Sequence, residues 1–210
     1  IVYDKHASIN FTYLLMALIV GITCNVFNVG INQIADVEID RINKPTLPIP
    51  AGVLTLKEAK VIVIAALLIS LLVSFLISPY LFCVVLLAIT IGWAYSMPPL
   101  YLKQHHLPAA FAIATVRGVL LNACGFMVFN YLANQSLEMP KNVKILTLFI
   151  IAFSIVISWF KDLSDMEGDS KYRIKTLAII HSPKVALIAG NLLVICAYIF
   201  TIYMKYFDLS

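Results

Sequence analysis

Six apolar segments, each about long enough to cross the hydrocarbon core of a bilayer, dominate this sequence of 210 residues. We expect the membrane-crossing segments at 9–31, 59–78, 80–97, 107–133, 143–160 and 184–207. Only 12% of the residues are charged, about half the share found in an ordinary soluble domain. The sequence therefore predicts an all-α, polytopic membrane helix bundle, an integral membrane protein surrounded by lipid.

The distribution of basic residues predicts the orientation of this bundle. With six crossings, the segments around 32–58, 98–106 and 161–183 fall on one side of the membrane, and most Lys and Arg residues lie there. Such an excess marks the side that faces the cytoplasm or the equivalent compartment of an organelle. The net charge of +4 is too small to indicate a nucleic-acid partner.

A row of polar side chains leads out of the first apolar segment. Its members are separated by three or four residues, and they are Asn25, Asn28, Asn32, Asp36 and Asp40. Side chains at these separations share one face of a helix. A spanning helix rarely carries such a row unless it faces a cavity or a partner. We therefore expect this row to carry function.

A second row follows the fifth apolar segment and also becomes acidic as the chain leaves the membrane. It comprises Ser154, Ser158, Asp162, Asp165 and Asp169. Seven of the eleven acidic residues belong to the two clusters that end these rows: Asp36, Glu38, Asp40, Asp162, Asp165, Glu167 and Asp169. Four predicted spans separate the clusters, and an even number returns the chain to the same side. We expect both clusters to meet at one opening of the bundle.

Carboxylates that gather without cations raise one another's pKa, so such a site favours hard divalent cations. Mg²⁺ often takes one or two carboxylates together with water and phosphate oxygens. Two such sites bridged by a diphosphate would use both clusters, and basic side chains would hold the remaining phosphate charge. The candidates for that role are Lys44, Lys103, Arg117, Lys161 and Lys171. The alternative is that each cluster is a solvated helix end, which does not explain why the rows extend into the bilayer.

Arg117 lies about ten residues inside the fourth span. A permanently charged guanidinium at that depth must face water, a counter-ion or a ligand. The sequence leaves two interpretations open, an ion pair with one of the aspartates or a contact with an anionic ligand.

These motifs resemble those of the UbiA superfamily of intramembrane prenyltransferases. The first signature, Asn-x-x-x-Asp-x-x-x-Asp, is present at Asn32, Asp36 and Asp40 and continues to Pro45. The second, Lys-Asp-x-x-Asp-x-x-Gly-Asp, runs from Lys161 to Asp169, and Tyr95–Lys103 resembles the central loop of the family. The individual residues of these motifs are most similar to those of the plant branch that prenylates homogentisate, flavonoids and other phenols.

The resemblance implies a nine-helix bundle, of which residues 1–210 would be a single transmembrane prenyltransferase domain truncated at both ends. It implies Mg²⁺-dependent transfer of a prenyl group from an allylic diphosphate to an aromatic acceptor, in a plastid membrane. The resemblance assigns catalytic and metal-binding roles to Asp36, Asp40, Asp165 and Asp169, with Asp162 as a further metal ligand. The expected substrate-binding residues are Asn32, Lys44, Tyr95, Lys103, Arg117, Lys161 and Lys171. No residue is identified as the base that removes the ring proton.

One residue departs from the pattern of this branch, because its members often carry glycine where this chain has Arg173. We expect this difference to change the shape of the loop beside the diphosphate. Three alternatives remain open. A cation-coupled transporter would distribute ionisable residues through the depth of several spans. A non-catalytic fragment is the second alternative, and a quinone, haem or chlorophyll prenyltransferase is the third.

Overall fold

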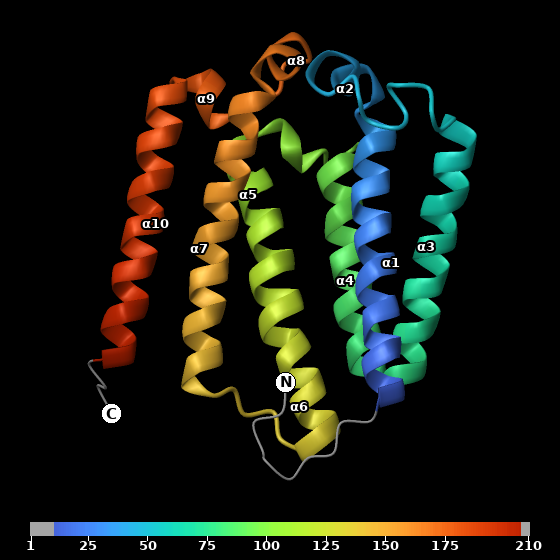
Figure 1. Ribbon diagram of the computed structural model, residues 1–210, viewed down its shortest axis with the longest axis vertical. Coiled ribbons are helices and arrows are strands. Elements are labelled where there is room, and N and C mark those ends of the chain that lie inside the picture. Colours follow the sequence, from blue (N-terminus) through green and yellow to red (C-terminus); the bar gives the residue numbers. More distant parts are fainter. Residues whose placement is uncertain (1–10, 207–210) are drawn as a thin grey trace. The chain divides into compact units, whose positions relative to one another are not determined.

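The computed structural model describes residues 11–206, and its regular elements there are helices (Figure 1). In chain order they are α1 (Phe11–Ala35), α2 (Val37–Asn43), α3 (Leu56–Ile77), α4 (Pro79–Ser96), η1 (Leu102–Gln104), α5 (His106–Ala114), η2 (Thr115–Cys124), α6 (Gly125–Asn134), α7 (Lys141–Ser164), α8 (Met166–Lys171), α9 (Leu177–Ile180) and α10 (Pro183–Tyr206). The η1 element is a 3₁₀ turn and η2 is a π-helix.

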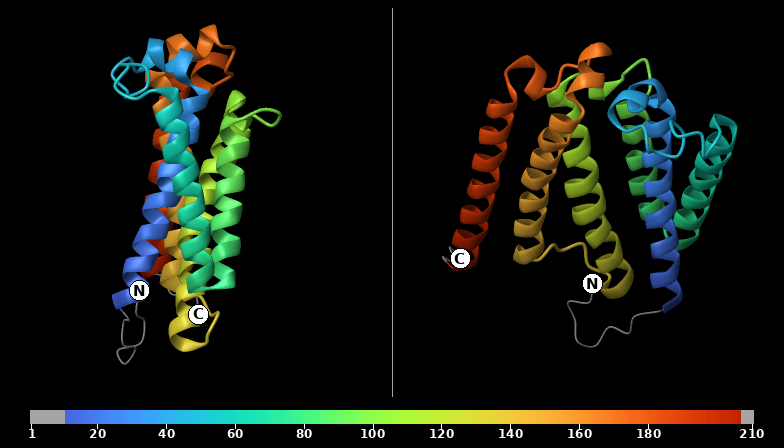
Figure 2. Two further views of the ribbon diagram at one scale, coloured as in Figure 1. Left: turned by 90° about the vertical axis from the view of Figure 1, so that its right-hand side faces the viewer. Right: turned by 45° about the horizontal axis from the view of Figure 1, so that its top comes forward.

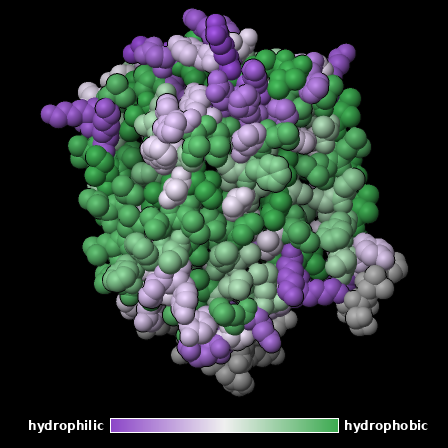
Figure 3. Space-filling model, turned by 180° about the vertical axis from the view of Figure 1, so that it is seen from behind, coloured by the Kyte–Doolittle hydropathy of each residue, from purple (hydrophilic) through white to green (hydrophobic). Residues whose placement is uncertain are grey.

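Six helices within the described residues are long and apolar enough to cross a membrane. They are α1, α3, α4, the continuous run His106–Asn134, α7 and α10. The predicted all-α membrane class and the six spans are therefore confirmed, with ends that differ by a few residues. Positions 9, 10 and 207 of the predicted spans lie outside the described residues. Figure 3 shows hydrophobic side chains over most of the visible face of these helices.

Local sequence signals explain where several spans begin. The hydroxyl of Thr55 accepts a hydrogen bond from the N–H of Glu58, whose carboxylate accepts one from the N–H of Thr55, so a capping box starts α3. Ser78 ends α3 and caps α4, whose first residue is Pro79. α10 likewise begins at a proline, and the hydroxyl of Ser182 accepts from the N–H of Val185. Proline suits the first helical position because a backbone N–H at that position would have no partner within the helix.

The chain forms two compact units, which are described separately. The α1 unit contains residues 11–101 and Cys124–Glu138. In this unit α1 packs against α3 and α4. The buried side chains of α3 repeat every three or four residues and are mostly small: Ala59, Val63, Ala66, Ser70, Ser74 and Ile77. Small residues let membrane helices approach closely, and Gly30 of α1 lies directly against Val63.

The α7 unit contains Leu102–Ala123 and residues 139–206. Here α7 packs against α5 and α10, and Figure 2 shows α7 beside α10 in its right-hand view. Glycine again permits close approach, since a β-carbon at Gly190 of α10 would collide with the ring of Phe160 on α7. The amide of Asn122 in η2 donates a 2.7 Å hydrogen bond to the hydroxyl of Thr147 on α7. Such bonds satisfy polar groups that lipid cannot satisfy.

Candidate active site

A break at Asp36 separates α1 from α2. Asp36 has φ −102° and ψ 11°, in the sparsely populated bridge region where many active-site residues are found. The polar row that the sequence predicts is therefore divided between two helices. The helical hydrogen-bond spacing nevertheless survives, because the N–H of Asp36 bonds to the carbonyl of Asn32 (2.9 Å) and the N–H of Asp40 bonds to that of Asp36 (2.7 Å). The break bends the chain and keeps the motif in register.

A break with the same local geometry separates α7 from α8. Asp165 has φ −100° and ψ 4°, and the N–H of Asp169 donates a 3.0 Å hydrogen bond to the carbonyl of Asp165. The second acidic motif therefore also interrupts its helix at an aspartate and continues with a buried aspartate four residues later. Neither break contains proline or glycine at the interrupting position.

The four aspartates at these breaks are buried, whereas the glutamates between them are exposed. Asp36, Asp40, Asp165 and Asp169 retain 9, 6, 4 and 7% of their accessible surface. The exposed Glu38 forms an ion pair with Arg41 at 2.8 Å, and Glu167 is also exposed. Asp36 and Asp165 occupy the N-cap positions of α2 and α8, but neither side chain caps its helix. Their carboxylates therefore serve other contacts.

Polar side chains continue inward from the Asp36 break, as the sequence predicts. Asn28 and Asn32 are half-buried, whereas Asn25 is exposed. The hydroxyl of Ser96, which is almost fully buried at the end of α4, donates a 3.3 Å hydrogen bond to Oδ1 of Asn32. This contact gives Asn32 a fixed neighbour that the sequence did not indicate.

Two further candidates belong to the α1 unit. The N–H of Lys44, just after α2, donates a 2.8 Å hydrogen bond to the carbonyl of Asp40, so its backbone is tied to the first motif. Tyr95 is half-buried and directly precedes Ser96. The α1 unit thus holds Asn32, Asp36, Asp40, Lys44 and Tyr95.

The α7 unit holds the second motif and most of the candidate cations. Nζ of Lys161 lies 3.9 Å from Oδ2 of Asp165, whose Oδ1 accepts a 3.0 Å hydrogen bond from Ser164. Asp162 is half-buried and Lys171 is exposed. The inward row continues with Ser154 and Ser158, both buried.

Lys103 is a buried lysine in the same unit. The loop that carries it is paired with the segment after α8. The N–H of Lys175 donates to the carbonyl of Gln104 (2.8 Å), and the carbonyl of Lys175 accepts from the N–H of His106 (3.1 Å). Gln104 and His106, just after Lys103, are thereby fixed beside the chain that follows α8, an arrangement that the sequence did not indicate.

Arg117 lies in the π-helix η2 and its side chain is exposed. In the part of the chain that the structure describes, its guanidinium forms no ion pair. The interpretation of Arg117 as the partner of an aspartate thus has no support within these residues. π-helical segments are rare and are often found at functional sites.

The described residues contain no group of three or more His, Cys, Asp or Glu side chains that could hold a metal ion by themselves. Each unit instead supplies a pair of buried aspartates four residues apart. Mg²⁺ accepts one or two carboxylates and completes its shell with water and substrate phosphate oxygens. The donor set therefore fits Mg²⁺. The prediction that the two clusters share one opening stays a prediction.

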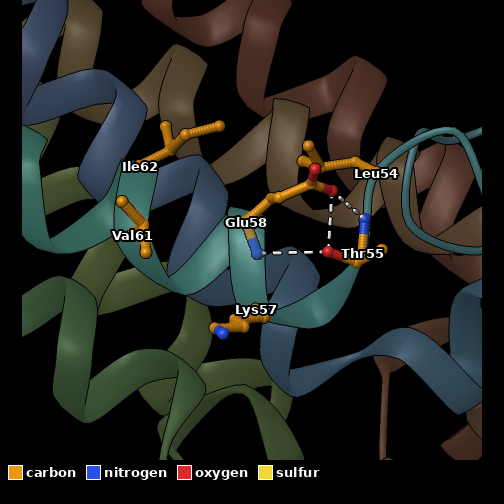
Figure 4. Close-up of a pocket in the computed structure, with 6 residues that line it drawn as sticks. All are labelled: Leu54, Thr55, Lys57, Glu58, Val61 and Ile62. Carbon is orange, nitrogen blue, oxygen red and sulfur yellow. Dashed lines mark hydrogen bonds between the residues drawn. The ribbon is translucent and has the colours of Figure 1, made fainter.

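A shallow pocket lies at the start of α3 (Figure 4). Its lining residues are Leu54, Thr55, Lys57, Glu58, Val61 and Ile62, none of which is a candidate site residue. Thr55 and Glu58 are engaged in the capping box described above. We therefore give this pocket a structural role at the start of the helix.

Comparisons with known proteins agree with the motifs. The model of the UbiA prenyltransferase family matches residues 1–209. Homogentisate phytyltransferase of Synechocystis sp. is 40% identical over 155 residues, which cover 74% of this chain and 50% of that protein. Probable homogentisate phytyltransferase 2, chloroplastic, of Oryza sativa subsp. japonica is 39% identical over 189 residues, covering 89% of this chain and 49% of that protein. The chain thus spans about half the length of the curated relatives it matches.

Among solved structures, a UbiA homolog from Archaeoglobus fulgidus bound to GPP and Mg²⁺ has a similar fold. It superimposes with a TM-score of 0.71 at 22% identity, covering 95% of this chain and 68% of that one. At this identity the similarity concerns the fold alone.

Proposed function

Because this chain belongs to the UbiA prenyltransferase family, we propose that it transfers a prenyl group from an allylic prenyl diphosphate to an aromatic acceptor of the homogentisate or phenolic type. The names of its relatives support this class of acceptor. We also propose that both units belong to one prenyltransferase domain, since the family model matches residues from both.

The observation that carries this proposal is the matched pair of helix breaks. Asp36 and Asp165 have nearly the same backbone conformation, and each precedes a second buried aspartate at the same spacing. An even number of candidate spans lies between α2 and α8, which supports a common membrane face for both breaks. We assign metal binding to these four aspartates, with Asp162 and Asn32 in support.

Basic side chains would hold the diphosphate as its bond to the prenyl carbon breaks. We assign this role to Lys44, Lys103, Arg117, Lys161 and Lys171. When bound, Mg²⁺ supplies positive charge where negative charge develops on the leaving diphosphate. A buried lysine such as Lys103 is suited to a phosphate oxygen, because its charge is poorly screened by water.

The apolar spans and Tyr95 would protect the electron-deficient prenyl group. Hydrophobic helices exclude the water that would otherwise capture it. An aromatic face such as that of Tyr95 attracts positive charge. The diphosphate departs with the electron pair of its bond to the prenyl carbon, an electron-rich ring carbon of the acceptor then forms the new bond, and the ring proton is lost.

The protein is an integral membrane protein, and we propose a plastid membrane as its location because a relative is named chloroplastic. The decisive assay uses microsomes that carry the full-length protein, a panel of prenyl diphosphates and a panel of phenolic acceptors, with and without Mg²⁺. Prenylated acceptor is expected only with Mg²⁺ present. An absence of product with every donor and acceptor pair would refute the proposal.

A further inference from the structure

Arg173 has a left-handed backbone, with φ 58°. It closes α8 in a Schellman motif, in which the N–H of Arg173 bonds to the carbonyl of Ser170 (3.2 Å) and the N–H of Ile174 bonds to that of Asp169 (2.8 Å). Glycine is the usual residue at this position, because any other side chain is strained there. An arginine in this conformation therefore suggests that its side chain has a use.

Two more basic side chains flank this turn. Lys171, Arg173 and Lys175 are all exposed, and among residues 11–206 none of the three forms an ion pair. Their positive charges are therefore not neutralised by ion pairs with neighbouring carboxylates. The backbone of Lys175 is held on both sides by Gln104 and His106, so the turn is fixed within its unit.

The same turn contains a candidate catalytic residue. The carbonyl that accepts from Ile174 belongs to Asp169, whose buried carboxylate we assign to metal binding. Lys171, Arg173 and Lys175 lie two, four and six residues after Asp169 along the chain. Clustered charges of one sign raise the local concentration of an oppositely charged ligand and its rate of association.

We propose that Arg173, together with Lys171 and Lys175, binds the phosphate oxygens of the prenyl diphosphate as it approaches Asp165 and Asp169. This inference rests on the proposed function. A guanidinium is suited to the role because its planar donors can contact two phosphate oxygens at once. The chain thereby gains diphosphate affinity at a position where its backbone is strained.

The test separates the charge of Arg173 from its backbone strain. The full-length protein is reconstituted in phosphatidylcholine liposomes as wild type, Arg173→Gly, Arg173→Gln and Arg173→Lys. Loss of the charge in the Gly and Gln variants is expected to raise KM for the prenyl diphosphate about two- to fivefold with kcat unchanged. The Lys variant keeps the charge but loses the second planar donor, so its KM is expected to lie between those of the wild type and Arg173→Gln. Lys144→Gln, at an exposed lysine near the other end of α7, is the matched control and should not change KM.

Thermal stability provides the second measurement. Arg173→Gly removes the strain and should raise the melting temperature by roughly 2–4 °C. A more stable protein with a higher KM cannot be explained by partial unfolding. In addition, kcat/KM of the wild type should fall more steeply with salt than that of Arg173→Gly. Added ions screen the attraction between Arg173 and the diphosphate, which only the wild type has.

Three results would overturn the inference. Equal KM values for wild type, Arg173→Gly and Arg173→Gln would show that the side chain does not contact substrate. Differences that appear only after phosphatidylglycerol is added would assign Arg173 to anionic lipid instead. A wild type without turnover of any prenyl diphosphate would refute the proposed function as well, whereas turnover with unchanged KM refutes this inference alone.

Discussion

The N–H of Lys175 donates a 2.8 Å hydrogen bond to the carbonyl of Gln104, and through it the loop before α5 is tied to the chain after α8. The loop contains the buried Lys103, and the partner segment follows α8, the helix that contains Asp169. Gln104, just after the central loop, and Lys175, six residues after the second acidic motif, are thus joined by a backbone hydrogen bond within one unit. This pairing provides the first test.

His106→Pro should loosen this pairing and leave α5 intact. Residue 106 is the first of α5, where proline is tolerated, and His105 before it is extended, as a residue before proline must be. Of the backbone hydrogen bonds, the variant loses only the one from the N–H of residue 106 to the carbonyl of Lys175, at a cost of about 1 kcal/mol. Amide hydrogen exchange in residues 172–176 should become faster. His106→Ala keeps this N–H and should exchange at the wild-type rate; equal rates in both variants would contradict the pairing.

Asp36→Asn and Asp165→Asn should each reduce turnover at least about 100-fold. Changes to groups that merely support a metal ligand already cost 10- to 100-fold, and a ligand itself should cost more. The microsomal prenylation assay, repeated at several Mg²⁺ concentrations, measures the loss. Glu38→Gln and Glu167→Gln remove exposed carboxylates from the same motifs and serve as matched controls. If the glutamate variants lose as much activity as the aspartate variants, the assignment of metal ligands is wrong.

Lys103→Gln should raise KM for the prenyl diphosphate by about 10- to 100-fold, the range of a hydrogen bond to a charged group. The reason is that a buried ammonium group is weakly screened by water. Initial rates over a range of diphosphate concentrations provide the measurement. Lys57→Gln, at an exposed lysine in the first turn of α3, should behave like the wild type. An unchanged KM in the Lys103 variant would remove it from the substrate site.

Gly92→Ala should destabilise the α1 unit by about 1–3 kcal/mol. The added β-carbon would collide with the amide of Asn28, which belongs to the polar row of α1. Gly21 of α1 has open space where a β-carbon would go, so Gly21→Ala should be neutral or stabilising by up to roughly 1 kcal/mol. Melting curves of the two purified variants in detergent give the comparison. Equal melting temperatures would show that the contact at Gly92 has no energetic importance.

The spans and their starting points were predictable because each depends on neighbouring residues. A capping box such as that of Thr55 and Glu58 needs only two side chains three residues apart, a pattern that can be read in the sequence. Ser182 and Pro183 are a similar case. The membrane class followed from segment length and composition, which are properties of the sequence itself.

The interruptions at Asp36 and Asp165 were missed for a physical reason. Sharp bends in helices usually occur at proline, glycine or inserted groups, and the interrupting residue in both cases is an aspartate. The pairing of Gln104 with Lys175 was also missed, because no local pattern encodes contact between distant segments. Arg173 was noted as an unusual residue in its motif, but its left-handed conformation became visible only in the structure.

Backbone hydrogen bonds join Asp36 to Asn32 and Asp40 to Asp36. Because of them, a change in the number of residues in this stretch should be tolerated less well than a change of side chain. One residue inserted between Asp36 and Asp40 would turn the second carboxylate about 100° around the helix axis, away from the first. In a set of active relatives, residues 32–44 should therefore tolerate exchange of the exposed side chains, whereas insertions and deletions there should be absent.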